Sequence, residues 1–570
     1  MGISHFILDK NVQSFRKSTA LFCAVALVAA VGYKPVQAEA SYMQRYMTSS
    51  IDEKIKSMKF NPAVYDGVIS FYQQRDFAPL WVDEGQGLID KANVVISELE
   101  RAWQHGLNPQ KYLDKDILGA NYSRRKSVLA RSEFLLSYGL ALYAHDMTSM
   151  RVDPKAIKQH EEYWRKPIAP SVVLHKAAEQ ADLRSYIHSL EPQNGLYKRL
   201  KKEYVQMVTS DEFHQPQVEV TYAGIIQPGQ SHKTVAQFRA RMGMPKLDGM
   251  DNYVYDDALV EKISAFQKDN GLKTDGVLGP QTVKYLNRTA RERADQLLAN
   301  MERMRWIEPD RPKKYIEVNI PSMSLWGFED GQATLNMPVI VGRTYRPTKS
   351  FVAEITGVRI NPRWTVPHRI RTQDYWPKMK EDPSVLLEKK IDVIEGYGHE
   401  AIYHDPTAID WKNMGWREFN KYRLVQQPGD HNALGRIRVL MPNQHVIYLH
   451  DTNHPELFDQ DYRSESSGCI RLKYPEKVAE FILKGNDIEW GTPRMQEIYD
   501  SLKPKDLMVE HKMPIYILYQ TNWLNARGEI VYGPDLYKED RKLIAALDKQ
   551  GDYYVPARDV IDEDMKIALR

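Results

Sequence analysis

The spacing of hydrophobic residues changes near residue 312 of the chain. Up to about residue 220, apolar residues recur at steps of three and four, for example Phe134, Leu135, Tyr138 and Leu142, a spacing that places them on one side of a helix. From residue 314 onward, short alternating apolar runs at 315–320, 338–341, 357–360 and finally 515–520 are separated by turn residues, which predicts strands. The pattern therefore predicts a multidomain α+β protein, with a helical scaffold at 39–220 and a mostly β domain at 312–536.

Between these two parts, the pattern predicts a small helical module at 221–290 and a helical linker at 291–311. In the module, Leu259, Ile263 and Phe266 share one face of a predicted helix that ends at Asn270-Gly271, and Pro280 is suited to begin the next one. After the last strand, the tail at 537–570 is highly charged and partly helical. No chemistry is assigned to it.

A long segment interrupts the predicted strands at 361–432. It is rich in aromatic residues and contains one predicted helix at 384–390. Long insertions between strands commonly form lids or loops that hold substrate, so we expect a lid that caps a site. The alternative is a subdomain that stabilises the fold and does not touch substrate.

The N-terminus has the layout of a secretory signal. Lys10, Arg16 and Lys17 precede an apolar run at 20–31, and small residues follow at 36–38, which predicts a signal peptide over 1–38 and a periplasmic mature protein. The run would span ~18 Å as a helix, less than a hydrocarbon core of ~30 Å. A retained inner-membrane anchor is the alternative.

Composition adds two constraints. The 570 residues are 42% hydrophobic and allow about three domains, while a net charge of +3 gives no reason to expect nucleic-acid binding. Of the two cysteines, Cys23 lies in the predicted signal. The mature protein would therefore carry Cys469 as a lone thiol, without a disulfide partner, in an oxidising compartment.

Cys469 is the candidate nucleophile and His450 its candidate base. An apolar run at 446–449 ends in His450, and a polar loop returns through Ser467 and Gly468 to Cys469. A thiol is only a few per cent ionised near neutrality, and an imidazole within reach takes its proton. Gly468 permits a close backbone approach, and the N–H groups around Cys469 are suited to hold an oxyanion. A buried, inert cysteine is the alternative, but the polar loop disfavours it.

His454 gives this segment a second histidine, four residues after His450. That spacing occurs among zinc ligands on helices. Pro455 and the preceding strand pattern argue against a helix, and the glutamate of such motifs is missing. We therefore predict no metal and no cofactor. Asp451 either orients His450 through its side chain or only solvates the loop.

The arrangement H-(loop)-S-S-G-C-I-R resembles the signature of YkuD-type L,D-transpeptidases, which cross-link bacterial peptidoglycan. In many members a histidine precedes Gly-Cys, whereas Ser467 stands there in this chain. That departure, together with the run at 448–452, is similar to the large multidomain YcbB-like branch and leaves His450 as the motif histidine. The resemblance implies a β-sandwich-like catalytic unit, with Arg471 and Tyr448 lining the site.

A second resemblance lies in the small module. The run F-Q-x-x-x-G-L-x-x-D-G-x-x-G-P-x-T at 266–282 resembles a peptidoglycan-binding domain, which implies wall contact near Asp275, Gly276 and Gly279. The alternative is that these glycines only shape turns and that the module is a spacer.

Together, the resemblances imply an enzyme that forms 3→3 cross-links through a thioester on Cys469 and releases D-Ala. Its partners would be donor and acceptor stem peptides and other wall-synthesis proteins, and carbapenems would acylate it. Three alternatives remain: an L,D-carboxypeptidase, a transpeptidase that attaches a wall protein, and a non-catalytic peptidoglycan-binding scaffold. Products and covalent modification of Cys469 distinguish them.

Overall fold

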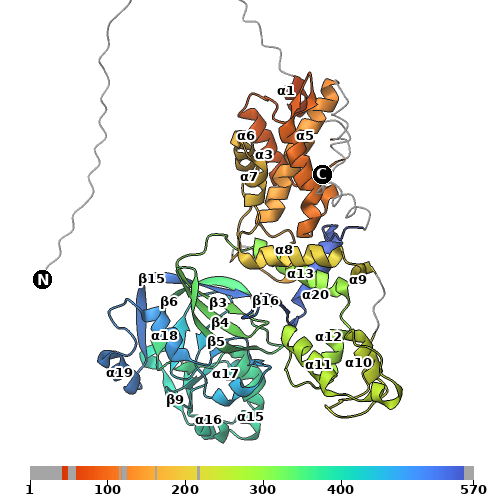
Figure 1. Cartoon of the computed structure of the whole chain (residues 1–570). Coiled ribbons are helices and arrows are strands. Elements are labelled where there is room, and N and C mark those ends of the chain that lie inside the picture. Colours follow the sequence, from red (N-terminus) through yellow and green to blue (C-terminus); the bar gives the residue numbers. More distant parts are fainter. Residues whose placement is uncertain are drawn as a thin grey trace, which may run out of the picture.

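The computed structural model describes residues 42–48, 60–114, 117, 125–160, 163–214 and 219–557. A helical unit, a small helical module and a β-rich unit are visible in Figure 1, which confirms the predicted multidomain α+β class. The predicted signal peptide lies outside the described residues. Among the helices that are described, none combines the length and the apolar content needed to cross a bilayer.

The helical unit surrounds one long buried helix, α5 (Lys126–Thr148), whose apolar residues cover every side and which packs against α3, α4 and α6. Asn61 caps the beginning of α3, because its side chain accepts the N–H groups of Ala63 and Val64. The remaining elements are α1 (Tyr42–Thr48), α3 (Pro62–Gln73), β1 (Val82–Asp83), β2 (Gly87–Leu88), α4 (Asp90–Glu100), α6 (Pro170–Glu179), α7 (Leu183–Ser189), α8 (Gly195–Val208) and α9 (Asp211–His214).

Two later segments complete the core of the helical unit. Helix α13 (Ala290–Arg305) begins with a capping box between Thr289 and Glu292 and packs along α8. Where the sequence predicts a linker, the helix is instead largely buried, because Leu297, Leu298 and Met301 belong to the core. The tail likewise contributes α20 (Glu539–Gln550), whose Leu543 and Leu547 enter the same core.

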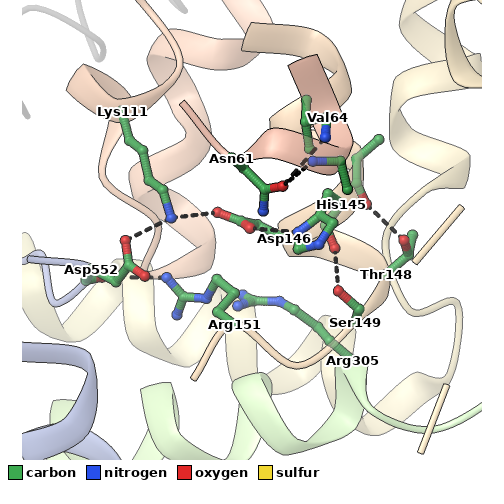
Figure 2. Close-up of polar contacts among 12 residues, drawn as sticks. Asn61, Val64, Lys111, His145, Asp146, Thr148, Ser149, Arg151, Arg305 and Asp552 are labelled. Atoms are coloured by element: carbon green, nitrogen blue, oxygen red, sulfur yellow. Dashed lines mark hydrogen bonds and ion pairs between the residues drawn. The ribbon is translucent and has the colours of Figure 1, made fainter. Parts of the chain in front are cut away.

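A polar cluster joins the C-terminal segment to this unit, as Figure 2 shows. Lys111 donates to Asp146 at 3.0 Å and to Asp552 at 2.7 Å. Arg151 donates to the carbonyl of Asp552 and pairs with the buried carboxylate of Glu302 at 2.7 Å. Because the residues come from distant parts of the chain, the cluster fixes the C-terminal segment against the helices.

The small module contains α10 (Val235–Arg241), α11 (Asp257–Asp269) and α12 (Pro280–Leu286) around its own core. The predicted end of α11 near Asn270 and the start of α12 at Pro280 are confirmed. The intervening turn is built around Gln267, whose side chain bonds to Asp275, Gly276 and Val277.

The β-rich unit is one sheet with strand order β13-β5-β14-β12-β11-β6-β15-β3-β4, and an additional β4–β5 pairing closes it on itself. The β-sandwich-like unit implied by the resemblance thus takes the form of a single closed sheet around a second core. The strands are β3 (Lys314–Asn319), β4 (Ser324–Glu329), β5 (Gln332–Gly342), β6 (Phe351–Ile360), β11 (Ile437–Leu440), β12 (Leu449–His450), β13 (Ser464–Ser466), β14 (Ile470–Leu472) and β15 (Lys505–Leu518).

Other elements lie around the closed sheet. Helix α18 (Pro475–Leu483) begins at a proline and buries Val478 and Ile482 against the sheet. Helix α19 (Pro493–Asp500) follows, and β16 (Asn522–Leu524) and β17 (Ile530–Tyr532) form a hairpin. Trp523 of this hairpin lies 3.3 Å from the position that a Cβ on Gly271 would occupy, so the hairpin packs closely on the small module.

The insertion folds into a second sheet of order β7-β10-β8-β9 with four helices. Trp411 and Phe419 of the insertion belong to the same core as the closed sheet, so the insertion is packed firmly on it. Its elements are β7 (Trp364–Thr365), α14 (His368–Ile370), α15 (Trp376–Glu381), α16 (Ser384–Glu388), β8 (Ile391–Glu395), β9 (Ile402–His404), α17 (Trp416–Phe419) and β10 (Tyr422–Gln426).

Candidate active site

Strand pairing brings His450 and Cys469 to the same face of the sheet. Strands β12 and β14 run parallel, with Leu449 opposite Ile470 and His450 opposite Arg471. Residues opposite each other share a face, and every second residue along a strand returns to it. Cys469 immediately precedes β14, and continuing the alternation by one residue beyond the strand places it diagonally from His450, although nineteen positions separate the two in the sequence.

The Cys469 sulfur contacts polar groups of the segment that precedes β12. Its Sγ donates to the carbonyl of Val446 at 3.9 Å, and both the backbone N–H and the hydroxyl of Tyr448 hydrogen-bond to the sulfur. Burial nevertheless raises the pKa of the thiol, against the action of Tyr448 and of nearby Arg438. This direction favours a neutral thiol at rest. Transfer of its proton to His450 stays a prediction.

The His450 ring is held in one tautomer. It is only 5% exposed, and its Nδ1 lies 2.5 Å from the carbonyl oxygen of Asp451. Because a carbonyl only accepts, Nδ1 carries the proton and Nε2 is left as the basic nitrogen. Burial, followed by the charge of Arg471, lowers the pKa of His450 to about 3. The imidazole is thus neutral at physiological pH and competent as a general base.

Asp451 orients His450, but through its backbone. Its carboxylate accepts the N–H groups of Arg436 at 2.8 Å and Thr452 at 2.6 Å, which fixes the peptide whose carbonyl holds the imidazole. A Cβ on Gly435 would lie 2.1 Å from this carboxylate. The side-chain role considered from the sequence is therefore replaced by a main-chain one, and Gly435 is a site residue that the motif does not contain.

The loop before Cys469 is shaped by internal hydrogen bonds. Gly468 has φ +118°, which favours glycine, and its N–H donates to Ser466 Oγ at 3.1 Å. Ser467 Oγ accepts from Arg346 at 3.0 Å. The N–H of Gly468 is therefore already in use, whereas the N–H of Cys469 has no acceptor among the described residues. Of the N–H groups considered from the sequence, that of Cys469 is the one suited to an oxyanion.

The insertion touches this site at two points. The Trp364 side chain, at the insertion's first strand, hydrogen-bonds to the Tyr448 hydroxyl. Asp374 forms two hydrogen bonds, both 2.6 Å, with Arg346, the residue that also donates to Ser467. These contacts join the insertion to the loop that carries Cys469. They are consistent with the lid, whose action on substrate stays a prediction.

Arg438 is a further residue beside the site that sequence reasoning missed. It lies opposite His450 on β11, as Arg471 does on β14, and its guanidinium carbon is 4.2 Å from the centre of the Tyr448 ring. An alternating apolar run, Ile437 and Val439, flanks it in the sequence. The alternating run predicts that Arg438 lies on a strand and on which face, but not which residues of other strands lie beside it. Only the register of the strands places it next to His450.

The remaining predicted residues are used structurally. Asp275 accepts from Gln267 and from the N–H of Val277, both at 3.0 Å, and Gly276 has φ +64°. Gly279 is the N-cap residue of α12. Wall contact by this turn stays a prediction. His454 pairs with Glu456 at 3.0 Å. In the part of the chain that the structure describes, no three His, Cys, Asp or Glu side chains gather to hold a metal ion.

Three family models match the chain. Residues 66–203 match a scaffold domain, residues 235–286 match one described as "Putative peptidoglycan binding domain", and residues 313–506 match the L,D-transpeptidase catalytic domain. The matched regions correspond to the helical unit, the small module and the β-rich unit with its insertion.

A curated relative and two solved structures are similar to this chain. A Haemophilus influenzae protein described as "Putative L,D-transpeptidase" is 32% identical over 315 residues, which are 54% of this chain and 61% of that protein. The chain therefore spans about three fifths of the length of this relative. An L,D-transpeptidase structure from Xylanimonas cellulosilytica is 13% identical, over 53% of this chain and 100% of the other, with a TM-score of 0.15. One from Stackebrandtia nassauensis is 12% identical, over 53% and 97%, with a TM-score of 0.18.

Proposed function

We infer that this chain, which carries an L,D-transpeptidase catalytic domain at residues 313–506, is an L,D-transpeptidase that acts on peptidoglycan through Cys469. The observation that carries the proposal is the placement of a neutral imidazole at the end of β12 and of the lone described thiol immediately before the neighbouring strand β14. The match of the small module to a peptidoglycan-binding model supports the choice of substrate.

In the first half-reaction, Cys469 Sγ attacks the carbonyl of the third residue of a donor stem. His450 Nε2 takes the thiol proton as the S–C bond forms, and the N–H of Cys469 donates to the oxyanion. The C–N bond to the terminal D-Ala then breaks. The leaving amine takes its proton from His450, and a thioester remains on Cys469.

In the second half-reaction, a side-chain amine of a neighbouring stem attacks the thioester. His450 accepts the proton of this amine, and the thiolate leaves and recovers its proton. The product is a 3→3 cross-link between two third residues. Because both resting groups are neutral, proton transfer accompanies the attack on the carbonyl and does not precede it.

The test uses the mature chain with a tetrapeptide stem as donor and acceptor. We expect a mass increase on Cys469 equal to the donor acyl group, release of D-Ala, and a 3→3 dimer identified by tandem mass spectrometry. Cys469→Ala should lose all three. His450→Gln should slow acylation by about 10²–10⁴-fold, whereas the matched His454→Gln, at an exposed histidine paired with Glu456, should not. A Cys469→Ala protein that still forms the dimer would refute the mechanism.

Two further proposals follow from the same assignment. The predicted signal at 1–38 would deliver the protein to the periplasm, and cell fractionation with N-terminal sequencing of the mature protein tests this. Carbapenems would acylate the same thiol, because their strained amide offers Cys469 a carbonyl. Intact-mass analysis of wild-type and Cys469→Ala proteins tests this second proposal.

A further inference from the structure

Two arginines flank His450 across the sheet. Arg438 on β11 and Arg471 on β14 each lie directly opposite it, so their side chains leave the same face as His450 and Cys469. The Nε atom of each guanidinium is buried and has no hydrogen-bond partner. Neither arginine forms an ion pair or hydrogen bond with a carboxylate among the described residues. Two cations at a reacting centre without counter-ions are costly.

The acidic side chains near these arginines are already engaged. Asp506 on β15 lies opposite Arg359, which in turn lies opposite Arg438. Its carboxylate binds Arg359 through two hydrogen bonds, one of 2.6 Å. Near Arg471, Glu465 accepts from Arg343 at 2.9 Å, and Glu456 pairs with His454 at 3.0 Å. Among the described residues, the acids that act electrostatically on Arg438 and Arg471 are thus each bound to another partner, and none forms an ion pair with either arginine.

We propose that Arg438 and Arg471 form a carboxylate-binding subsite for the terminal carboxylate of the donor's leaving residue. The inference rests on the proposed function, because it takes Cys469 as the nucleophile. It adds a recognition element that selects donors ending in a free carboxylate.

The dimensions of the sheet suit this carboxylate. It lies three covalent bonds from the carbon that Cys469 attacks, which is at most about 4 Å. Along a strand, Cys469 and Arg471 are separated by about 6.7 Å. A leaving residue whose scissile carbonyl lies at the sulfur therefore places its carboxylate toward Arg471, with Arg438 approaching from the other side of His450. Other carboxylates of a stem peptide lie more bonds away from the scissile carbon.

Binding of the carboxylate would also act on the base. The charges of Arg471 and Arg438 both lower the pKa of His450. An anion held between the guanidiniums offsets these charges, so the proton affinity of His450 rises when a donor is bound. The other groups facing the ring are the Asp451 carbonyl, which has the opposite effect to the arginines, and the Tyr448 ring at 5.7 Å. Recognition of the correct donor would thereby strengthen the base that the reaction needs.

The decisive experiment measures binding without turnover. In a Cys469→Ala background, calorimetry compares a tetrapeptide stem ending in D-Ala with the same peptide ending in D-Ala amide. Because hydrogen bonds to charged groups contribute about 1.5–3 kcal/mol, we expect the acid to bind about 10–100-fold more tightly. Adding Arg438→Gln or Arg471→Gln should reduce this preference to about threefold or less, with amide binding unchanged.

The matched control is the double variant Arg359→Gln/Asp506→Asn, which removes an ion pair beside Arg438 without releasing an unpaired acid toward it. The preference for the acid should survive it. Equal binding of acid and amide, or a preference that persists in both arginine variants, would overturn the subsite. If the acid is preferred but the wild-type enzyme forms no cross-link, the subsite stands and the proposed reaction fails.

An independent readout follows the imidazole by NMR in the same Cys469→Ala background. Adding the acid peptide should raise the pKa of His450, and the amide peptide should leave it unchanged. Arg438→Gln should raise the pKa of His450 in the free protein, which a purely structural role for Arg438 does not require. A pKa that responds equally to both peptides would contradict the proposal.

Discussion

At the scale of single residues, the surroundings of His450 and Cys469 each favour one protonation state of these side chains. His450 is held by the Asp451 carbonyl, and burial together with flanking positive charge lowers its pKa to about 3. Burial raises the pKa of the Cys469 thiol. Both directions favour a neutral pair at rest, so in the proposed reaction the acid–base step would accompany the attack on substrate.

The protonation states predict the pH dependence of acylation. His450 is neutral at any pH well above 3, so the rate of Cys469 acylation by a donor peptide should be nearly constant between about pH 5 and 8. It should show no fall near 6.5, the ordinary pKa of histidine. Intact-mass time courses over this range provide the measurement. An acidic limb centred near 6.5 would show that the imidazole is solvated and not buried.

Gly435 provides a second residue-scale prediction. Gly435→Ala should slow acylation at least tenfold, because its Cβ would lie 2.1 Å from the carboxylate of Asp451 and displace the carbonyl that holds His450. Its φ of +58° adds a cost of about 1–2 kcal/mol to folding. The control is Gly331→Ala, with φ +80° but open space around it. Chemical denaturation should show a similar backbone cost in the control, with acylation unchanged.

At the scale of elements, the insertion and the nucleophile loop are joined by Arg346. This buried arginine binds Asp374 of the insertion and Ser467 of the loop. Trp364, at the start of the insertion, meets Tyr448 beside Cys469. The insertion is thus attached both through the shared core and through polar contacts at the site.

Weakening this attachment should affect the reaction more than the fold. Asp374→Asn should slow acylation severalfold while lowering stability by about 0.2–1 kcal/mol, the range for partly exposed ion pairs. Asp506→Asn is the control, because the Asp506 carboxylate is as exposed as that of Asp374 and pairs with Arg359. It should leave acylation nearly unchanged. Single-turnover mass spectrometry and thermal unfolding provide the two measurements. Parallel losses of rate and stability would favour the alternative of a purely stabilising subdomain.

At the scale of the whole molecule, segments far apart in sequence complete one helical core. Glu302 on α13 is fully buried between Arg151 and Arg305, and α20 returns from the end of the chain to pack on α13. The helical unit also reaches the loop before His450, where the Tyr163 ring lies 5.6 Å from that of His445. The β-rich and helical units are therefore in contact beside this loop, with α8 and α13 near the junction in Figure 1.

Glu302→Gln should destabilise the protein by about 3–5 kcal/mol, because it leaves two buried guanidinium groups without their carboxylate. The control is Glu329→Gln, which removes a surface pair with Lys484 and should cost less than about 1 kcal/mol. Urea unfolding followed by far-UV circular dichroism measures both. A loss below about 1 kcal/mol for Glu302→Gln would mean that water reaches the cluster.

The same residue predicts a pH dependence of stability. Arg151 and Arg305 lower the pKa of Glu302 in the folded state against the effect of burial. The unfolded chain therefore binds the proton more readily, and the stabilisation is present above the usual glutamate pKa of about 4.3 and is lost as pH falls below it. The Glu302→Gln variant should lose part of the wild-type dependence between about pH 4 and 2.

The sequence by itself determined which helices, strands and turns this protein forms, and which two side chains are the candidates for chemistry. Helical spacing, helix starts such as Pro280 and turns such as Asn270-Gly271 act over a few residues, so element types and several of their ends are correctly predicted. The chemistry of a lone thiol and a strand-end histidine is likewise local information. It names the two groups and does not give their protonation states.

Only the tertiary structure decided what depends on contacts between distant residues. Register placed Arg438 beside His450, and the fold gave the orienting role to the backbone of Asp451 and not to its side chain. Packing turned the expected linker and tail into core helices. Burial set the proton positions on His450 and Cys469, since the cost of a charge depends on its three-dimensional surroundings. These properties arise from residues that no local pattern brings together.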